Sequence, residues 1–237
     1  MAYSKSKVDR AGKIVADGLR SIIDKQSVDD EEILAMAEAV DVIDWWRTEH
    51  SLPLSRVAAN LRYYVAAEGK PIVAQRLKKA PTITSKLVRE PKMRLSRMAD
   101  IGGVRAVLPS QDAAFRVAKR LRKNWTITKF RDYVTEPKAD GYRALHLINR
   151  NRGRLIEVQL RTPKQEFWAN GVEIFSRSMA PGLKFGAGPP WLREFFQTLG
   201  EFYADQDSGS AVDEALFDRV RELSAEVDTL VRKSNEP

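Results

Sequence analysis

The sequence contains no cysteine, and only two of its 237 residues are histidine. A disulfide framework is therefore excluded, and a chain without thiols suits a reducing compartment. No apolar run approaches the length of a membrane span, and the first residues lack the apolar segment of a secretory signal. We therefore expect a cytoplasmic protein that does not associate with membranes.

The charge is strongly unbalanced toward cations. Lys and Arg number 40 against 32 Asp and Glu, which gives a net charge of +8 at neutral pH, and the excess is concentrated between residues 76 and 161. Such a field attracts the phosphates of a nucleotide or of a nucleic acid. A solvated basic surface without a ligand is the alternative for any single charge, but it does not explain cations that recur at motif spacings.

Apolar periodicity predicts three helices before residue 70, followed by a mixed region. The first helix has its apolar stripe from Val8 to Ile23, the second is capped by Ser27 with Asp30 three residues later, and the third begins beyond Ser51. The strand-like runs are 72–76, 101–108, 125–130, 142–149 and 155–161. The later helical segments are 82–90, 111–123, 163–178, 191–203 and 212–232.

These elements predict an α+β fold, in which strands and helices mix around a sheet and further helices stand at both ends of the chain. We divide the chain into an N-terminal helical region at 1–70, a core at 71–180 and a C-terminal helical extension at 181–237. The last two strands are close enough in sequence to form a hairpin through residues 150–153.

Side-chain alternation gives the last strand one polar and one apolar face. Glu157, Gln159 and Arg161 share one face, because side chains switch faces with a period of two residues. On the preceding strand the same rule groups Tyr142 with His146. Taken singly, a tyrosine or histidine in a strand is more often a packed or satisfied residue than a functional one. The Gly turn just before these residues favours a functional face instead.

Upstream of that hairpin, cations and a carboxylate form a second group. Arg76, Lys78 and Lys86 pass from a strand end into the first turns of a helix, where the helix N-terminus also favours phosphate. Asp100 precedes two glycines and is a natural Mg²⁺ ligand, with Glu157 as the second carboxylate. Strand parity places Asp100 and Arg105 on opposite faces unless Gly102 and Gly103 form a bulge.

Four ordered motifs resemble the synthetase domain of the RelA/SpoT family, from about Arg76 to Ser178. The motifs are Arg76-x-Lys78-x-x-x-Thr82-Ile83-x-x-Lys86, Asp100-Ile101-Gly102-Gly103-x-Arg105, Asp132-Tyr133-x-x-x-Pro137-Lys138-x-x-Gly141-Tyr142-x-x-x-His146 and Ile156-Glu157-x-Gln159-x-Arg161-Thr162. The resemblance implies a nucleotidyltransferase-like fold, with a mixed β-sheet flanked by helices. It also implies a reaction that moves the β,γ-pyrophosphate of ATP onto a ribose 3′-hydroxyl.

The resemblance implies a role for each residue on the ATP side. Arg76 and Arg105 would sandwich the adenine, while Lys78 and Lys86 would hold the phosphates. Asp100 would bind Mg²⁺ and would count as catalytic.

On the acceptor side, Glu157 would either share the metal with Asp100 or take the proton from the attacking hydroxyl. Tyr142 would stack on the acceptor base. The other residues that the resemblance places there are Arg131, which stands where the family often has Lys, together with Lys138, His146, Gln159 and Arg161.

Two acceptors fit the motifs. One is GDP or GTP, as in small alarmone synthetases. The other is the 3′-CCA end of tRNA, as in toxic small members of the family that are found beside antitoxin genes or in phages, and it implies an antitoxin protein as a partner. The stretches from Tyr3 to Lys13 and from Trp46 to Leu54 resemble the toxic group, and the net charge agrees, so we favour tRNA. The cations that could contact RNA are Lys5, Lys7, Arg10 and Lys13, for which a solvated helix face is the alternative.

Two further expectations follow from what the motifs include and omit. Neither His50 nor His146 is followed by Asp, so the His-Asp metal pair of the family's hydrolase domain is missing and we expect a stand-alone synthetase. A silent nucleotide-binding or RNA-binding module is disfavoured, because Asp100, Glu157 and Tyr142 are all present. The sequence leaves the oligomeric state open.

Overall fold

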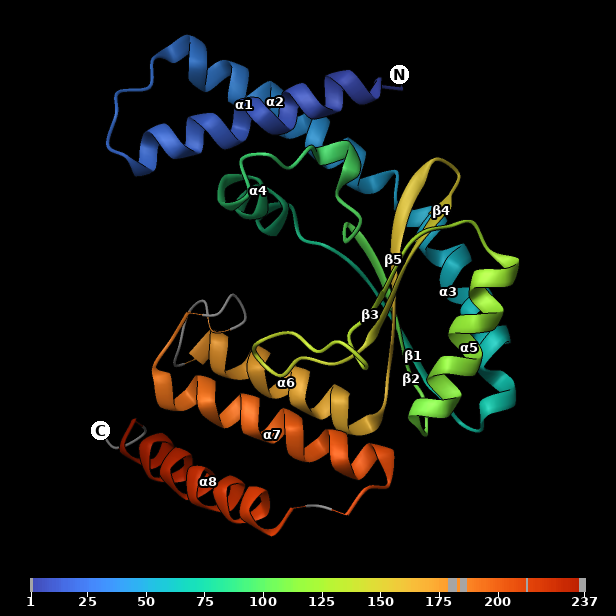
Figure 1. Ribbon diagram of the computed structural model, residues 1–237. Helices are drawn as coiled ribbons and strands as arrows, with labels where there is room; N and C mark the ends of the chain where they lie inside the picture. The colour runs from blue at the N-terminus through green and yellow to red at the C-terminus, as the bar shows by residue number, and fades with distance from the viewer. Residues whose placement is uncertain (1, 179–182, 184–186, 212, 235–237) are drawn as a thin grey trace.

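The computed structural model describes residues 2–178, 183, 187–211 and 213–234. It is an α+β fold, as predicted, in which a five-stranded sheet has helices at both ends of the molecule (Figure 1). The predicted division at 180 and 181, and Val212 at the predicted start of the last helix, lie outside the described residues. The three-part domain division stays a prediction.

The N-terminal region consists of α1 (Lys5–Ile23), α2 (Asp30–Thr48) and α3 (Ser51–Val65), followed by the short 3-10 helix η1 (Ala66–Glu68). The predicted cap of α2 is wrong. Asp29, not Ser27, is the N-cap, because its side chain accepts from the backbone N of Glu32 at 2.8 Å while the Glu32 side chain accepts from the Asp29 backbone N at 3.2 Å. This reciprocal pair satisfies two helix-end N–H groups.

The sheet has the strand order β1-β2-β5-β4-β3. The strands are β1 (Ile72–Leu77), β2 (Gly102–Val107), β3 (Ile127–Asp132), β4 (Leu145–Asn151) and β5 (Arg154–Arg161). Only the β2–β5 pair is parallel and the other pairs are antiparallel, so the sheet is mixed, as expected. The order places β5, which carries the predicted polar face, near the centre of the sheet.

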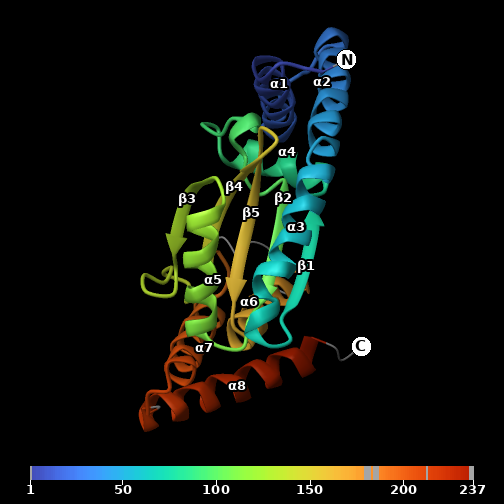
Figure 2. The same ribbon diagram turned by 90° about the vertical axis from the view of Figure 1, so that its right-hand side faces the viewer.

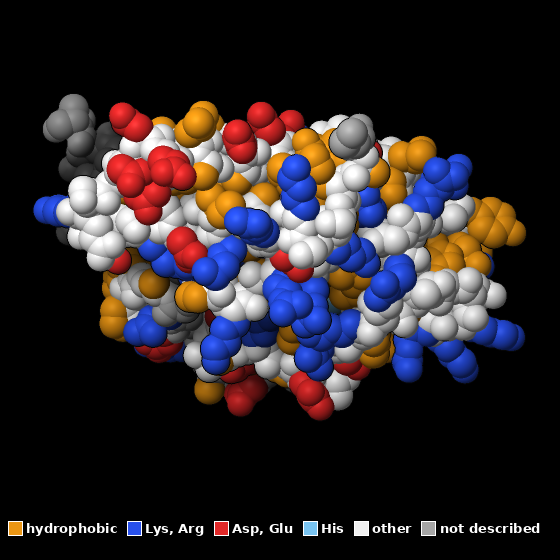
Figure 3. Space-filling view, turned by 90° about the horizontal axis from the view of Figure 1, so that it is seen from above, with side chains coloured by type: hydrophobic (Ala, Val, Ile, Leu, Met, Phe, Trp, Pro, Cys, Tyr) orange, Lys and Arg blue, Asp and Glu red, His pale blue; other side chains and the backbone are white. Residues whose placement is uncertain are grey.

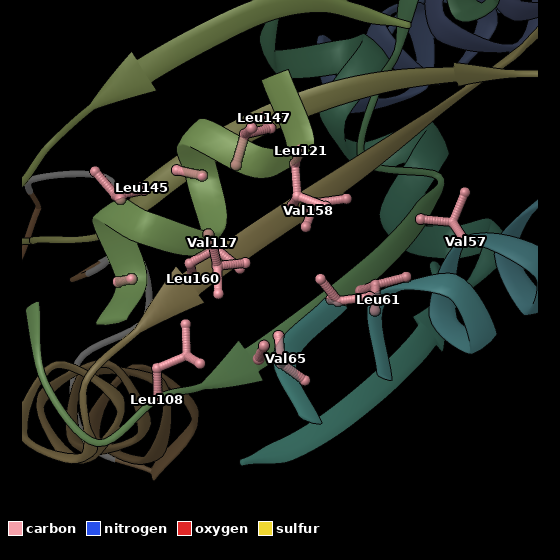
Figure 4. Packing of buried hydrophobic residues seen from close by; sticks show 14 of the residues in the cluster. Val57, Leu61, Val65, Leu108, Val117, Leu121, Leu145, Leu147, Val158 and Leu160 are labelled. Atoms are coloured by element: carbon pink, nitrogen blue, oxygen red, sulfur yellow. The ribbon is translucent and has the colours of Figure 1, made fainter. Parts of the chain in front are cut away.

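The apolar face of the sheet is covered by α3 and by α5 (Gln111–Asn124), which Figure 2 shows in front of the strands. Leu61 from α3, Leu121 from α5 and Leu160 from β5 are fully buried in this layer, which Figure 4 shows from close by. Each such side chain stabilises the fold by roughly 1.5–3 kcal/mol relative to exposure. The opposite face of the sheet is therefore the one left for polar residues.

The β4–β5 hairpin forms as predicted, but β4 begins three residues later than expected. A two-residue turn joins the strands, with positive φ at Arg152 (48°) and Gly153 (75°), which suits a tight hairpin. Tyr142 lies in the loop before β4, because Gly141 has a φ of 88° and the Tyr142 backbone N bonds the Asp140 side chain at 3.0 Å. The ladder therefore begins only at Leu145.

The remaining helices flank the polar side of the sheet. α4 (Ala80–Arg89) and the 3-10 helix η2 (Leu95–Arg97) lie beneath α1, whereas α6 (Pro163–Ser178), α7 (Pro190–Ser208) and α8 (Glu214–Ser234) are stacked at the other end (Figure 1). Across the described part of the chain, no helix combines the length and apolar character that crossing a membrane would need. The polar face of the sheet thus lies between α4 and α6.

Candidate active site

The register of the strands brings the predicted polar residues together on one face. Gly103 of β2 pairs with Arg76 on one side and with Glu157 on the other, so these positions share a face. Gln159 of β5 likewise pairs with Arg105 and with His146. The predicted parity of Glu157, Gln159 and Arg161 against the buried Ile156, Val158 and Leu160 is confirmed.

Two cavities open on this face, and they meet at two carboxylates. The β1-side cavity has a volume of about 340 Å³ and is lined by Arg76, Arg105 and Arg177 among others. The β3-side cavity has a volume of about 400 Å³, and its walls include Lys86, Arg131, Tyr133 and His146. Asp100 and Glu157 line both cavities. The arrangement has room for two separate ligands with acidic groups at their boundary.

Asp100 is held between two lysines. Lys78 Nζ and Lys86 Nζ each donate to one oxygen of the carboxylate at 3.0 Å. Burial alone would raise the pKa of Asp100, but the charges of Lys78 and Lys86 and their hydrogen bonds bring that pKa below its ordinary value. The carboxylate is therefore ionised at neutral pH.

The expected conflict between Asp100 and Arg105 does not arise. Asp100 lies in the turn before β2, and the register of Gly102 and Gly103 with both neighbouring strands is continuous, so no bulge is needed. Both side chains line the β1-side cavity. The parity rule failed here because it was applied to a residue outside the strand.

Glu157 belongs to a closed ring of hydrogen-bonded side chains. Its Oε1 bonds His146 Nδ1 at 3.1 Å, and its Oε2 accepts from Gln159 Nε2 at 2.8 Å. Burial raises the pKa of Glu157 and Asp100 adds to that effect, but the hydrogen bonds from His146 and Gln159 leave the pKa below its ordinary value. Glu157 is thus an ionised carboxylate able to accept a proton.

The ring closes through Tyr142 and Arg161. Arg161 Nη2 donates to the Tyr142 hydroxyl at 2.9 Å and to Gln159 Oε1 at 2.8 Å, and the same hydroxyl bonds His146 Nε2 at 2.6 Å. Because the hydroxyl accepts from Arg161, its own proton points to His146, which leaves Nδ1 of His146 as the donor to Glu157. Burial raises the pKa of Tyr142 and outweighs the opposing effect of Arg161, so the phenol keeps this proton.

The sequence prediction missed two residues. Glu166, in the first turn of α6, accepts from Arg105 Nη2 and from Arg161 Nη1, each at 3.0 Å. Tyr133 lines the β3-side cavity and packs edge-on against His146 with ring centroids 5.2 Å apart. The only signals available in the sequence were the acidic residue in the first turn of a helix and the aromatic beside Asp132.

The predicted acceptor residues fall into separate places. Arg131 and His146 line the β3-side cavity, whereas Gln159 and Arg161 line the β1-side cavity. Tyr142 and Lys138 line neither of the two cavities. The Lys138 ammonium lies 4.7 Å from the centroid of the Tyr142 ring. The exposed Lys138 ammonium therefore lies over the ring that was expected to stack on a base.

The two carboxylates suit a hard cation such as Mg²⁺, which binds one or two protein carboxylates together with substrate phosphates. Within the residues that the structure describes, no group of three or more His, Asp or Glu side chains is placed to hold a metal by itself. Asp100 and Glu157 fit this pattern, with nucleotide phosphates as the remaining ligands.

Known proteins resemble this chain over the residues that form the site. Residues 75–177 match the family described as the region found in RelA / SpoT proteins. Among curated relatives, GTP pyrophosphokinases YwaC and YjbM of Bacillus subtilis are each 33% identical over 109 residues, which cover 42% and 41% of this chain and 49% and 52% of theirs. An uncharacterized protein of Mycobacterium tuberculosis is 31% identical over 127 residues, 51% of this chain and 45% of that protein. The chain thus spans about half the length of these relatives.

Solved structures agree on the fold. Small alarmone synthetase 1 of B. subtilis bound to its product pppGpp has a TM-score of 0.56 and 22% identity, covering 78% of this chain and 99% of that one. Small alarmone synthetase 2 of the same organism has a TM-score of 0.51 and 23% identity, covering 73% of this chain and 94% of that one. The molecule is a mixed-sheet protein whose polar face carries Lys and Arg side chains around Asp100 and Glu157, an arrangement that suits phosphate groups. Residues 75–177 are thus similar to the region found in RelA / SpoT proteins, and the fold is that of the small alarmone synthetases.

Proposed function

We propose that this protein is an ATP-dependent pyrophosphotransferase, or pyrophosphokinase, that moves the β,γ-pyrophosphate of ATP to a ribose 3′-hydroxyl. The proposal depends on one observation. Two cavities lined by Lys and Arg meet at Asp100 and Glu157, which belong to the wall of both. ATP would occupy the β1-side cavity, where Arg76 and Arg105 reach its base, and the acceptor would occupy the β3-side cavity. Phosphoryl transfer depends mainly on such positioning and on charge stabilisation.

Each bond and proton of the proposed transfer can be assigned to the substrates and to the residues at the shared wall. The acceptor 3′-oxygen forms a bond to the β-phosphorus of ATP, the bond from that phosphorus to the oxygen bridging the α-phosphate breaks, and AMP leaves. Glu157 takes the proton of the 3′-hydroxyl, because it is ionised and its ring of hydrogen bonds fixes its position. Lys78 and Lys86 stabilise charge on the phosphates.

Asp100 would hold Mg²⁺ together with the ATP phosphates, and sharing that metal is the alternative role for Glu157, which lines the same two cavities. Bound there, Mg²⁺ would neutralise phosphate charge during the transfer. The Lys78 and Lys86 ammonium groups that contact Asp100 here would turn toward those phosphates.

For the acceptor we favour the 3′-CCA end of tRNA. This choice is supported by the basic face of the molecule and by the resemblance of the N-terminal stretches to toxic members of the family. Modifying that end would block translation and growth, so the protein would act as a cytoplasmic toxin with an antitoxin protein as partner. The alternative is a (p)ppGpp synthetase that uses GDP or GTP, and it is supported by the names of the two B. subtilis relatives.

The test is transfer of label from γ-labelled ATP with Mg²⁺, offering deacylated tRNA, GDP and GTP in parallel. Label in tRNA supports the favoured acceptor, and label in the guanine nucleotide supports the alternative. Glu157→Gln is the control, since it keeps the shape of the side chain and removes the base, and it should lower transfer about 10²- to 10⁴-fold. Absence of transfer to all three acceptors would overturn the proposal.

A further inference from the structure

A basic groove, larger than either cavity of the candidate active site, lies beside them. Its volume is about 840 Å³, and it is bounded by α1, by the segment 91–97 after α4 and by the β4–β5 hairpin. The α1 wall contributes Lys5, Arg10 and Lys13. The segment 91–97 contributes Arg94, and the hairpin contributes Arg150. Figure 3 shows the face seen from above Figure 1, where Lys and Arg gather across the centre and Asp and Glu lie mainly toward the upper and lower edges.

The cations of this groove are free to bind an anion. Over the ranges that the structure describes, the side chains of Lys5, Arg10, Arg94 and Arg150 make no ion pair and are exposed. The two carboxylates in the wall have partners of their own. Asp9 accepts from the backbone N and hydroxyl of Ser96, and Asp17 pairs with Lys13 and Arg20. The groove therefore presents a strong net positive charge.

The walls of the groove are held in place by hydrogen bonds and close packing. Asp9 fixes η2 against α1 through Ser96 at 2.8 and 3.0 Å. Arg20 Nη2 donates to the carbonyl oxygen of Leu87 at 2.6 Å, which ties α1 to the end of α4. Gly12 lets the two segments approach closely, since a Cβ there would lie 3.0 Å from the Cβ of the buried Leu95.

The groove adjoins the β3-side cavity. Met93, Arg97 and Leu155 line both, so the two spaces share a wall, and an extended ligand along that wall would contact both. A cavity of about 400 Å³ is the size of a single-ligand pocket, and the groove adds about 840 Å³ beyond it. A free nucleotide would leave this added space empty.

We propose that the groove binds the phosphate backbone of a single-stranded RNA whose 3′ end enters the β3-side cavity. This inference rests on the proposed function for the direction of the strand. Cations along a groove suit phosphates, while aromatic side chains suit bases. Tyr133 lies in the β3-side cavity, with the centroid of the Tyr142 ring 6.0 Å from its own, whereas none of the described residues that line the groove is aromatic. The groove would hold phosphates without regard to base sequence, and the terminal base alone would meet an aromatic ring.

The expected RNA-contacting set differs from the one predicted from the sequence. Lys5, Arg10 and Lys13 line the groove, but Lys7 does not. The Lys7 ammonium lies 4.5 Å from the centroid of the Tyr3 ring, and Lys7 lines a cavity between α1 and α2 that meets the groove only at Ser6 and Arg10. Lys7 is therefore a matched control, since it is on the same helix and of the same charge.

The test measures binding of a short RNA ending in CCA by fluorescence anisotropy, with the full chain and without ATP. Arg94→Glu combined with Arg150→Glu should weaken binding at least about 10-fold, because two phosphate contacts are lost. The slope of log affinity against log salt should become shallower by roughly 0.7 for each contact. Lys7→Glu should stay within about twofold of the unchanged protein, since only the groove contacts the strand.

The inference would be overturned if Lys7→Glu weakened RNA binding as much as the double variant does. The RNA would then be held by the overall positive electrostatic field of the protein and not by the groove. Unchanged binding in the double variant would overturn the inference as well. Binding is read without turnover, so a failure of pyrophosphate transfer is distinguishable from a failure of the groove.

Discussion

Gly200 of α7 lies directly against the backbone of Gly141, so that a Cβ on Gly200 would meet the Gly141 carbonyl oxygen at 2.6 Å. Gly141 immediately precedes Tyr142, and its φ of 88° sets the turn that delivers the ring. The same helix receives a hydrogen bond from Trp168 Nε1 to the Phe196 carbonyl at 2.6 Å. The C-terminal helices therefore support the loop that carries Tyr142.

We expect Gly200→Ala to weaken both stability and transfer. Alanine is about 1 kcal/mol better than glycine within a helix, so propensity alone predicts a gain. The added methyl meets backbone that has no rotamer to change, and overpacking of this kind costs about 1–3 kcal/mol. Urea unfolding and label transfer, measured on the same preparation, check the two effects.

Gly18→Ala is the control for that change. It also lies in a helix interior, but its Cβ would meet the thioether end of Met36, which can swing away. The free energy of unfolding should stay the same or rise by up to about 1 kcal/mol. If Gly200→Ala behaves like Gly18→Ala, α7 does not hold the loop.

Tyr142→Ala is expected to lower transfer about 10- to 100-fold, because stacking of one base on an aromatic ring is worth roughly 1–3 kcal/mol. The circular dichroism spectrum should be unchanged, since the helices and sheet do not depend on this ring. Tyr142→Phe keeps the stacking surface and removes only the hydroxyl that bonds His146 and Arg161, so it should lose less. Equal rates for Tyr142→Ala and the unchanged protein would remove Tyr142 from the site.

Glu166→Gln should raise the KM for ATP about 10-fold with a smaller effect on kcat, because a charge-assisted hydrogen bond is about twice as strong as a neutral one. Glu166 holds both Arg105 and Arg161, and its side chain is only 15% exposed. Glu201→Gln, an exposed change on α7, serves as the control. A change in kcat alone would show that Glu166 does not position Arg105 for the nucleotide.

Stability should fall as the pH is lowered from 6.5 toward 4, because burial lowers the pKa of His50 from 6.5 to about 4, despite its hydrogen bond to the Trp46 carbonyl. In that range the unfolded chain binds the proton and the folded chain does not. The loss is about 3 kcal/mol over the whole range. Urea unfolding at several pH values measures it, and His50→Gln should remove this part of the slope. An equal slope in both proteins would show that His50 does not titrate this way.

Strand parity and helix periodicity predicted most of the architecture, because they depend on local alternation. The faces of β5 and the hairpin after Asn151 followed from them, whereas the mixed character of the sheet was implied by the family resemblance. The N-cap at Asp29 was missed, since Ser27 and Asp29 are both good caps and only the reciprocal bond with Glu32 decides between them.

The site was predictable as a set of residues but not as a geometry. The motifs named Asp100 and Glu157, yet the division of the polar face into two cavities depends on strand order, which no local pattern contains. Glu166 was missed for a related reason. Its contacts with Arg105 join β2 to α6, elements that are far apart in sequence.

The boundary at Asp100 and Glu157 also bears on how the reaction ends. A pyrophosphorylated acceptor would keep its base in the β3-side cavity while its new phosphates extend across the boundary toward Lys78 and Lys86. The modified acceptor would thus fill parts of both cavities, which the two substrates occupy separately. Its new phosphates would be held by Lys78 and Lys86, which neither the acceptor nor AMP contacts alone. Escape of the modified acceptor, and not bond formation, would then set the pace of the cycle.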